Sequence, residues 1–350
     1  MSLTSDPKAT AGAPTGLLCE LLSHPETTLI TNPKPSFGWI LNDPRRGALQ
    51  TAYQIAITSA RPSGEPKADI WDSGKVQSAE STNAPYTGSP LRPGSYWWAV
   101  RTWDTDDRPT PWSEPQQISI GAATPGGSFY PDRWTTLEGK SEAVRVNRHP
   151  LEVESVSPKS VLQKAAGHYF VDFGRAAFGT LRLTLTSDTS DHQVEIRLGE
   201  KLGPNNAVEP NPGGSITYLQ QTLALERGTH TYKLTFPTWP RGVKMPEHIG
   251  EVIPFRYCEI INSPCAIETK DLKQLAVFYR FDDTASSFAS SDTTLNQVWE
   301  LCKYSIKATS FLGIYIDGQR ERLPYEADAY INQLGHYCVD REYAMARYSH

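Results

Sequence analysis

The hydrophobic pattern of the chain changes its period near Ser291, and this change constrains the fold more than any other feature of the sequence. Upstream, large apolar residues alternate along short runs, as in Tyr53, Ile55 and Ile57, which is the pattern of half-buried strands. Downstream, apolar residues recur with the helical spacing i, i+3, i+4, i+7 and i+11 at Leu295, Val298, Trp299, Cys302 and Ile306. The sequence therefore predicts a multidomain protein that is mainly β and then α.

A chain of 350 residues is longer than one ordinary domain. We expect a flexible leader over residues 1–15, a first β-sandwich over 16–121, a small linker around 122–127, a second β-sandwich over 128–288 and a helical part over 289–350. The predicted strands cover residues 36–41, 52–58, 70–76, 95–104, 117–120, 168–173, 180–186, 193–198, 218–225, 229–236 and 255–262. The 27 prolines, 9 Trp, 16 Tyr and 11 Phe favour this turn-rich β architecture.

Two helices are expected in the last part of the chain. The first covers about 294–309, with Thr294 and Gln297 as a capping box. The second begins at Pro324, a residue suited to the first helical position, and carries a second apolar stripe. That stripe consists of Ala327, Ile331, Leu334 and Cys338.

Composition excludes several classes of function. The net charge of −5 gives no basic footprint for nucleic acid or an anionic membrane, and no apolar run is long enough to span a bilayer. The five cysteines and eight histidines lack the spacings of metal sites, and no phosphate-binding glycine motif occurs. We expect no cofactor and no metal, with structural calcium not indicated. A soluble periplasmic, secreted or cytoplasmic protein fits equally, and the oligomeric state stays open.

The loop between the two helices is the strongest candidate site. Four carboxylates, two arginines and two tyrosines occur within residues 315–328. Glycoside hydrolysis needs one carboxylic acid to protonate the leaving oxygen, a carboxylate to activate water, and polar groups to hold the sugar. A solvated loop whose charges pair with one another is the alternative, so the residues alone indicate only a candidate acidic site.

Motifs in each part of the chain resemble known families. The segment SYWWAVRTWD (95–104), followed by Pro111, Trp112 and Ser113, resembles the late strands of a fibronectin type III module, which implies a spacer or docking domain. The segment DGQRERLPYEAD (317–328) resembles the catalytic signature of bacterial α-L-rhamnosidases, glycoside hydrolase family 78. FASSDTTLNQVW (288–299), YFVDFG (169–174) and VEIRLGE (194–200) are similar to the same family.

The resemblance implies a fibronectin type III-like sandwich, a jelly-roll-like β-sandwich and the start of an (α/α)6 six-hairpin barrel. By the same resemblance, Glu321 matches the general acid of an inverting α-L-rhamnosidase. Asp317, Arg320 and Asp328 match residues that hold the rhamnose, and Tyr325 stands where an aromatic face packs on the methyl side of the sugar. The substrate would be a rhamnosylated oligosaccharide or glycoside.

Departures from the family pattern affect the expected sugar preference. The loop is one residue shorter between Asp317 and Gln319, and Glu326 adds a second candidate acid. The last 60 residues hold two or three of the roughly twelve helices of such a barrel. We therefore expect that the general base lies beyond the printed residues, and that these residues, as the N-terminal part of a longer enzyme, do not turn over substrate alone.

Two other functions remain open from the sequence. A noncatalytic carbohydrate-binding or surface protein would bind sugar through the sandwiches, for which Trp239, Tyr218 and the loop 203–214 are candidates, although these aromatics also suit a core or an interface. A six-hairpin hydrolase for another deoxysugar or a uronide is the third reading.

Overall fold

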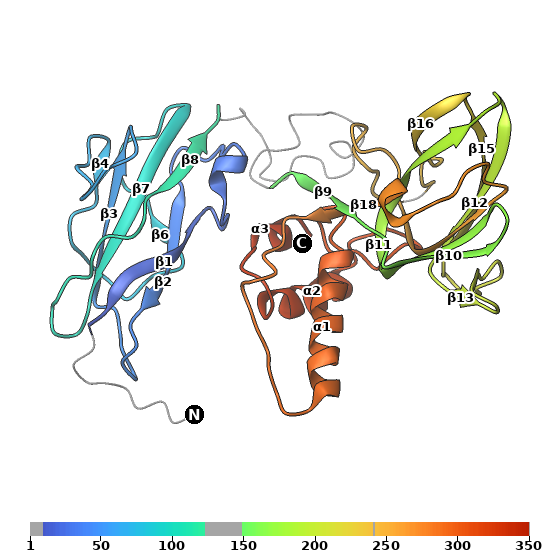
Figure 1. Ribbon diagram of the computed structural model, residues 1–350. Helices are drawn as coiled ribbons and strands as arrows, with labels where there is room; N and C mark the ends of the chain where they lie inside the picture. The colour runs from blue at the N-terminus through green and yellow to red at the C-terminus, as the bar shows by residue number, and fades with distance from the viewer. Residues whose placement is uncertain (1–9, 123–148, 241, 350) are drawn as a thin grey trace. The chain divides into compact units, whose positions relative to one another are not determined.

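The computed structural model describes residues 10–122, 149–240 and 242–349. They belong to two compact units (Figure 1). The first contains the described residues up to 122 together with 149–150 and 341–344, and the second contains the rest. The predictions for residues 1–9, for the linker residues 123–127 and for the beginning of the second sandwich at 128 lie outside the described residues.

The first unit is a two-sheet β-sandwich, as the sequence predicts. One sheet has the order β1-β2-β6 and the other the order β4-β3-β7-β8, with β5 also on β3. Tyr53, Ile55 and Ile57 of β3 are buried in the core between them. The strands are β1 (Gly12–Cys19), β2 (Ser36–Asn42), β3 (Ala52–Thr58), β4 (Trp71–Asp72), β5 (Val76–Gln77), β6 (Ala84–Pro85), β7 (Gly94–Trp103) and β8 (Gln116–Ile120), with a 3-10 turn η1 (Pro25–Thr27).

Two details of this unit differ from the sequence prediction. Residues 12–15 are not a leader, because they pair with β2 as the beginning of β1. The expected strand 70–76 is divided into β4 and β5 by a turn, in which the Asp72 carboxylate accepts the Gly74 N–H at 2.8 Å. Gly74 has a φ of 60°, a conformation that interrupts a strand.

The second unit is built on an eight-stranded sheet that turns back on itself. Its main path is β15-β12-β17-β11-β18-β9, with β10 and β16 also on β11. The strands are β9 (Leu151–Val156), β10 (Ser160–Ala165), β11 (His168–Ser187), β12 (His192–Gly199), β13 (Leu202–Gly203), β14 (Ala207–Val208), β15 (Tyr218–Leu225), β16 (Gly228–Lys233), β17 (Ile253–Ile261) and β18 (Leu272–Tyr279), with a 3-10 turn η3 (Thr269–Asp271).

Strand β11 joins the two halves of this sheet and replaces two separate strands of the sequence prediction. Its first half pairs with β10 and β17, and its second half pairs with β18 and β16. The register is broken between Asp172 and Ala177, where the strand bends. Side chains from both halves, such as Phe173 and Leu183, therefore enclose one core, and the prediction of a sandwich is confirmed.

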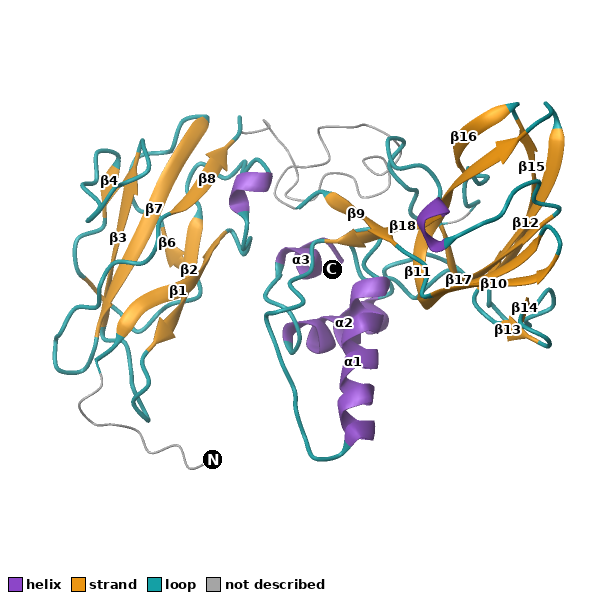
Figure 2. Cartoon of the chain, in the orientation of Figure 1, coloured by secondary structure: helices purple, strands orange, loops and turns teal. Residues whose placement is uncertain are grey.

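The last part of the chain is helical, as Figure 2 shows, with α1 (Thr293–Ala308), α2 (Glu326–Tyr337) and α3 (Ala344–Ser349). The predicted capping box is wrong, since Asp292 is the N-cap of α1 and its side chain accepts the N–H groups of Thr294 and Leu295. Tyr325 is the N-cap of α2, so Pro324 precedes the helix instead of opening it. No described helix is long and apolar enough to cross a bilayer.

The apolar stripes identify both helices, but they are not the faces that pack in the described part of the chain. Leu295, Val298 and Leu301 of α1 are exposed, as are Ile331 and Leu334 of α2. The buried residues of α1 are Lys303 and Lys307. The Lys307 ammonium pairs with Glu154 at 2.8 Å and with Asp283 at 2.9 Å, while the aliphatic stems of lysines can cover apolar surface.

Candidate active site

The segment between α1 and α2 contains the acidic loop, and the residues just before that loop are buried in the core of the second unit. Phe311, Leu312, Ile314 and Ile316 are buried, and they pack on apolar side chains of the sandwich, namely Phe178, Val243, Met245, Ile249, Val252 and Val277. The Phe311 ring stacks on Phe178 at 3.7 Å between centroids. The acidic loop therefore begins at a fixed point on the sandwich.

Arg322 holds the middle of the loop to the sandwich. Its guanidinium is fully buried and donates to the Glu251 carboxylate at 2.6 Å, to the Val252 carbonyl at 2.8 Å and to the Gln319 side-chain oxygen at 3.0 Å. It also lies over the rings of Trp239 and Phe311 at 5.1 and 5.3 Å. This residue received no role from the sequence, because Glu251 and Val252 belong to a distant segment.

Gly242 allows the sandwich backbone to approach the loop closely. Its φ is 65°, and a Cβ at this position would stand 2.1 Å from the Glu321 carbonyl oxygen. The neighbouring Val243 N–H donates to the Arg322 carbonyl at 3.2 Å. A side chain here would push the backbone of Glu321 away, so the position of the loop requires glycine.

Four of the five predicted site residues form one cluster. The Asp317 backbone and side chain both bond Leu323, with its carboxylate accepting the Leu323 N–H at 3.0 Å. Arg320 pairs with the Glu321 carboxylate at 3.1 Å. Glu321 also hydrogen-bonds the Tyr325 hydroxyl and the Asp317 carboxyl. The cluster thus contains two carboxyl groups in direct contact, one cation and one phenol.

The two carboxyl groups of the cluster have opposite pKa shifts. Burial raises the pKa of Asp317, and the adjacent Glu321 raises it further. The hydrogen bond from the Tyr325 hydroxyl lowers the pKa of Glu321, and Arg320 lowers it too. The shifts therefore favour the charged form of Glu321 relative to that of Asp317.

The fifth predicted site residue, Asp328, belongs to helix α2. It is exposed on the first turn of α2 and makes no hydrogen bond or ion pair with the other four in the described part of the chain. Glu326 is exposed on the same turn. Carboxylates at this place are favoured by the unpaired N–H groups of a helix N-terminus, which gives both a structural reason to be there.

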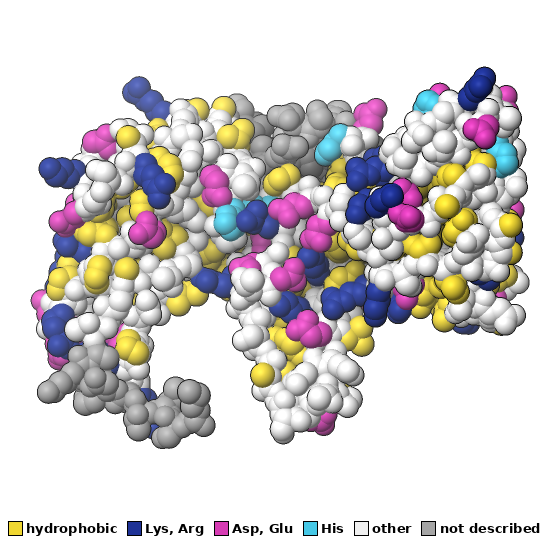
Figure 3. Space-filling view, in the orientation of Figure 1, with side chains coloured by type: hydrophobic (Ala, Val, Ile, Leu, Met, Phe, Trp, Pro, Cys, Tyr) yellow, Lys and Arg dark blue, Asp and Glu magenta, His cyan; other side chains and the backbone are white. Residues whose placement is uncertain are grey.

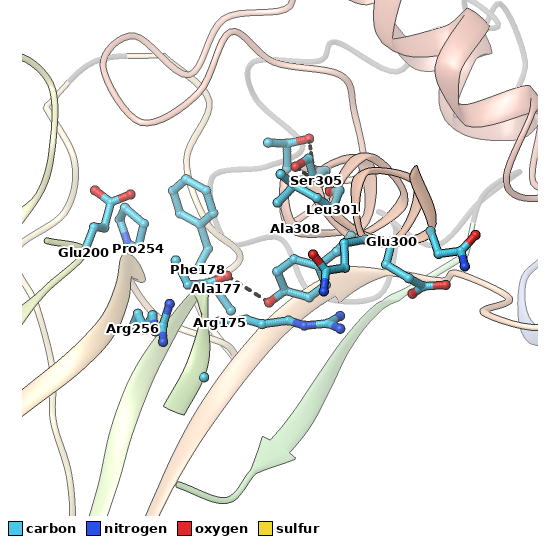
Figure 4. A pocket seen from close by; sticks show the side chains of 16 residues that line it. Arg175, Ala177, Phe178, Glu200, Pro254, Arg256, Glu300, Leu301, Ser305 and Ala308 are labelled. Atoms are coloured by element: carbon cyan, nitrogen blue, oxygen red, sulfur yellow. Dashed lines mark hydrogen bonds between the residues drawn. The ribbon is translucent and has the colours of Figure 1, made fainter. Parts of the chain in front are cut away.

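A second concave region lies where α1 meets the sandwich (Figure 4). This groove of about 830 Å³ is lined by residues of β11, β17 and α1, among them Arg175, Arg256, Glu300 and Tyr304. Lys and Arg side chains gather beside α1 in this part of Figure 3. Arg256 is paired with Asp172, and the Tyr304 hydroxyl donates to the Ala176 carbonyl. None of the predicted site residues lines this groove.

Metal-binding side chains are not clustered in the described part of the chain. Within the described ranges, no group of three or more His, Cys, Asp or Glu side chains is arranged to hold a metal ion.

Three family models match the chain in consecutive segments. Residues 14–124 match the Rha78A-like N-terminal immunoglobulin domain. Residues 162–278 match the bacterial alpha-L-rhamnosidase concanavalin-like domain, and residues 283–349 match the bacterial alpha-L-rhamnosidase 6 hairpin glycosidase domain. The last match contains the whole acidic loop.

Curated relatives agree with these matches. An alpha-L-rhamnosidase of Formosa agariphila is 34% identical over 194 residues, which is 52% of this chain and 19% of the relative. One from Streptomyces avermitilis is 38% identical over 101 residues, which is 29% of this chain and 10% of the relative. The matched parts thus span a fifth or less of the length of these relatives.

Solved structures share the fold. The alpha-L-rhamnosidase of Dictyoglumus thermophilum superposes with a TM-score of 0.66 at 14% identity, covering 94% of this chain and 57% of that one. The Streptomyces avermitilis alpha-L-rhamnosidase complexed with L-rhamnose gives 0.64 at 12% identity, covering 89% and 62%. The fibronectin-like prediction and the immunoglobulin match describe the same sandwich architecture.

Proposed function

Because this chain belongs to the bacterial α-L-rhamnosidases, we propose that its acidic loop serves the removal of terminal α-L-rhamnose from oligosaccharides or glycosides. The observation that carries the proposal is the contact of Asp317, Glu321 and Tyr325 in the segment matched by the six-hairpin domain. Cleavage of a glycosidic bond requires a carboxylic acid that protonates the leaving oxygen.

In this reaction Glu321 acts as the general acid. Its carboxyl O–H protonates the glycosidic oxygen as the bond from that oxygen to the anomeric carbon breaks, and the leaving sugar or aglycone departs as an alcohol. Asp317, Arg320 and Asp328 bind the rhamnose hydroxyls, while the Tyr325 ring packs on the methyl side of the sugar.

An inverting mechanism also needs a base on the opposite face of the sugar. The two carboxyl groups of such a pair stand about 6.5–9.5 Å apart, which leaves room for the attacking water. Asp317 is hydrogen-bonded to Glu321 and therefore leaves no such room. We therefore assign the activation of water to another carboxylate.

The test is hydrolysis of a panel of p-nitrophenyl glycosides by the full product of the gene. Its Glu321→Gln and Glu326→Gln variants are assayed in the same way. We expect release from the α-L-rhamnoside alone, with kcat reduced at least about a hundredfold in Glu321→Gln. Glu326→Gln is the control, and it stays within about threefold. An equal loss in both variants would assign the acid role to the pair of glutamates instead.

The same panel tests the other readings. Cleavage of a different deoxysugar glycoside or a uronide would show that the protein is a glycoside hydrolase with a different substrate. Binding of rhamnose oligosaccharides without cleavage of any glycoside would identify a noncatalytic carbohydrate-binding protein, and its binding site would then map to the sandwiches and not to Glu321.

A further inference from the structure

Tyr315, His336 and Asp340 form a buried hydrogen-bonded chain that starts two residues before Asp317. The Tyr315 hydroxyl lies 2.6 Å from Nδ1 of His336, and Nε2 of the same ring lies 3.1 Å from the Asp340 carboxylate. The three side chains belong to residues that are 3%, 0% and 4% exposed. All three lie in the second unit, and the acid catalysis proposed above gives none of them a part.

The Asp340 carboxylate determines which ring nitrogen of His336 carries the hydrogen. An ionised carboxylate can only accept hydrogen bonds, and the other oxygen of Asp340 accepts the Asp282 N–H at 3.3 Å. Nε2 of His336 therefore donates to Asp340, and in the neutral ring Nδ1 is the acceptor. The Tyr315 hydroxyl then donates to Nδ1.

Aromatic contacts keep the imidazole in this orientation. The Phe281 ring stacks on the His336 ring at 5.7 Å between centroids and 12° between planes. The Tyr315 ring packs edge-on against it at 5.7 Å and 86°. A flip of the imidazole would break both hydrogen bonds. The ring is thus a fixed support for the Tyr315 hydroxyl.

Tyr315 packs against different elements from its two neighbours. Ile314 and Ile316 pack on the sandwich, whereas Tyr315 packs with Ala329 of α2. The Tyr315 backbone N–H also donates to the Ser349 hydroxyl of α3 at 2.8 Å. Tyr315 therefore ties the segment before the acidic loop to the helices.

The bond between Tyr315 and His336 connects the two ends of the acidic loop. Asp317 follows Tyr315 by two residues and closes the loop through its two hydrogen bonds with Leu323. Tyr325 is the N-cap of α2, and His336 lies in the last turn of the same helix. Because one helix carries both residues, a hold on His336 also restrains the place of Tyr325.

We propose that His336 is a positioning residue of the acidic loop, because its bond to Tyr315 sets where Asp317 stands relative to Tyr325. It acts through the Tyr315 hydroxyl, and Asp340 keeps its acceptor nitrogen turned toward that hydroxyl. The proposal rests on the proposed function for its effect on catalysis, whereas its effect on the loop can be measured without any substrate.

Two amide variants separate positioning from packing. The side-chain oxygen of Asn lies as many bonds from the backbone as Nδ1 and can accept the Tyr315 hydroxyl, whereas the amide of Gln reaches the place of Nε2 and faces Asp340. Positioning therefore predicts that His336→Asn keeps the loop in place and that His336→Gln does not. Packing alone predicts the opposite order, because Asn is smaller and leaves the larger cavity.

Hydrogen exchange of this chain, followed by mass spectrometry, measures the hold on the loop. We expect peptides covering residues 313–325 to exchange at least about fivefold faster in His336→Gln than in His336→Asn. Tyr315→Phe loses the same hydrogen bond and should match His336→Gln, and the double variant should add little to either. Equal exchange in the two amide variants, faster exchange in His336→Asn, or additive effects in the double variant would overturn the proposal.

Hydrolysis of p-nitrophenyl α-L-rhamnoside by the full product of the gene separates this proposal from the proposed function. We expect His336→Asn to retain at least about fivefold more kcat/KM than His336→Gln, since a small displacement of the reacting groups is costly. The expected order in exchange, in a protein that cleaves no rhamnoside, keeps the positioning of the loop and rejects the hydrolase. Equal cleavage by both amide variants keeps the hydrolase and rejects the role of His336 in it.

Discussion

At the scale of single residues, the chemistry of the loop depends on where one proton lies. Asp317 and Glu321 are hydrogen-bonded carboxyl groups with opposite pKa shifts. Tyr325 is the largest cause of the low pKa of Glu321. Because a general acid must be protonated to act, the Tyr325 hydroxyl opposes the proposed role of Glu321.

This opposition predicts the pH dependence of Tyr325→Phe. Loss of the hydroxyl removes a donor to the Glu321 carboxylate, so the pKa of Glu321 rises. Activity that needs protonated Glu321 is lost as the pH rises through that pKa, and the alkaline limb of kcat/KM therefore moves to higher pH. Profiles with a neutral α-L-rhamnoside measure the limb, and a shift to lower pH would contradict the role.

The sequence predicts the four residues of this cluster. It does not predict the contacts that hold their loop on the sandwich. Asp317, Arg320, Glu321 and Tyr325 are close in the chain, so one short loop is enough to bring them together. Arg322 acts through Glu251 and Val252, about 70 positions away, and no local pattern indicates such a contact. The effect of Tyr325 on Glu321 also depends on side-chain geometry that spacing does not determine.

At the scale of elements, the loop is held by a buried ion pair. Both partners of the pair between Arg322 and Glu251 are nearly inaccessible to solvent, and burial lowers the pKa of Arg322. A buried charge that loses its partner is strongly destabilising, whereas removal of both charges costs less. The pair fixes the loop to the sandwich, and each buried charge is stabilised by the other.

A double-mutant cycle tests this interdependence. Arg322→Met should lower the free energy of unfolding by about 3–5 kcal/mol, because it leaves the Glu251 carboxylate buried without a cation. Adding Glu251→Gln should restore at least about 1 kcal/mol, since Gln keeps the acceptor oxygen without the charge. Urea unfolding of the four proteins measures the coupling. Strictly additive losses would show that the pair does not act as a unit.

At this scale, the helices show what the hydrophobic periodicity predicts and what it does not predict. The 3.6-residue pattern predicts α1 almost to its ends, because backbone hydrogen bonding and spacing are local properties. It does not predict which face packs, since Lys303 and Lys307 are buried while Leu301 is exposed. Those lysines find their acceptors at Asp283 and Glu154, which are outside the helix. Contacts between elements decide burial, and the helical pattern contains no information about them.

At the scale of the whole molecule, the chain has two separate principal cores. One fills the sandwich of the first unit and includes Ile55, and the other fills the sandwich of the second unit and includes Ile196. Both residues are buried isoleucines, with 0% and 1% of their surface exposed. The change of hydrophobic period near Ser291 does not coincide with the division between the units, since the acidic loop and α2 belong to the second unit with the sandwich. The acidic loop is therefore expected to depend on the stability of its own sandwich.

Matched substitutions in the two cores test this dependence. Ile55→Ala and Ile196→Ala each remove the same buried atoms and should each cost about 2–5 kcal/mol. Hydrogen exchange followed by mass spectrometry should show that Ile55→Ala releases protection in the first unit alone. Ile196→Ala should release it in the second sandwich and also in residues 311–325, because Phe311 and Arg322 anchor this segment to that sandwich. If the acidic loop kept its protection in Ile196→Ala, the helices alone would hold it, and the contacts with the sandwich would not determine the position of Glu321.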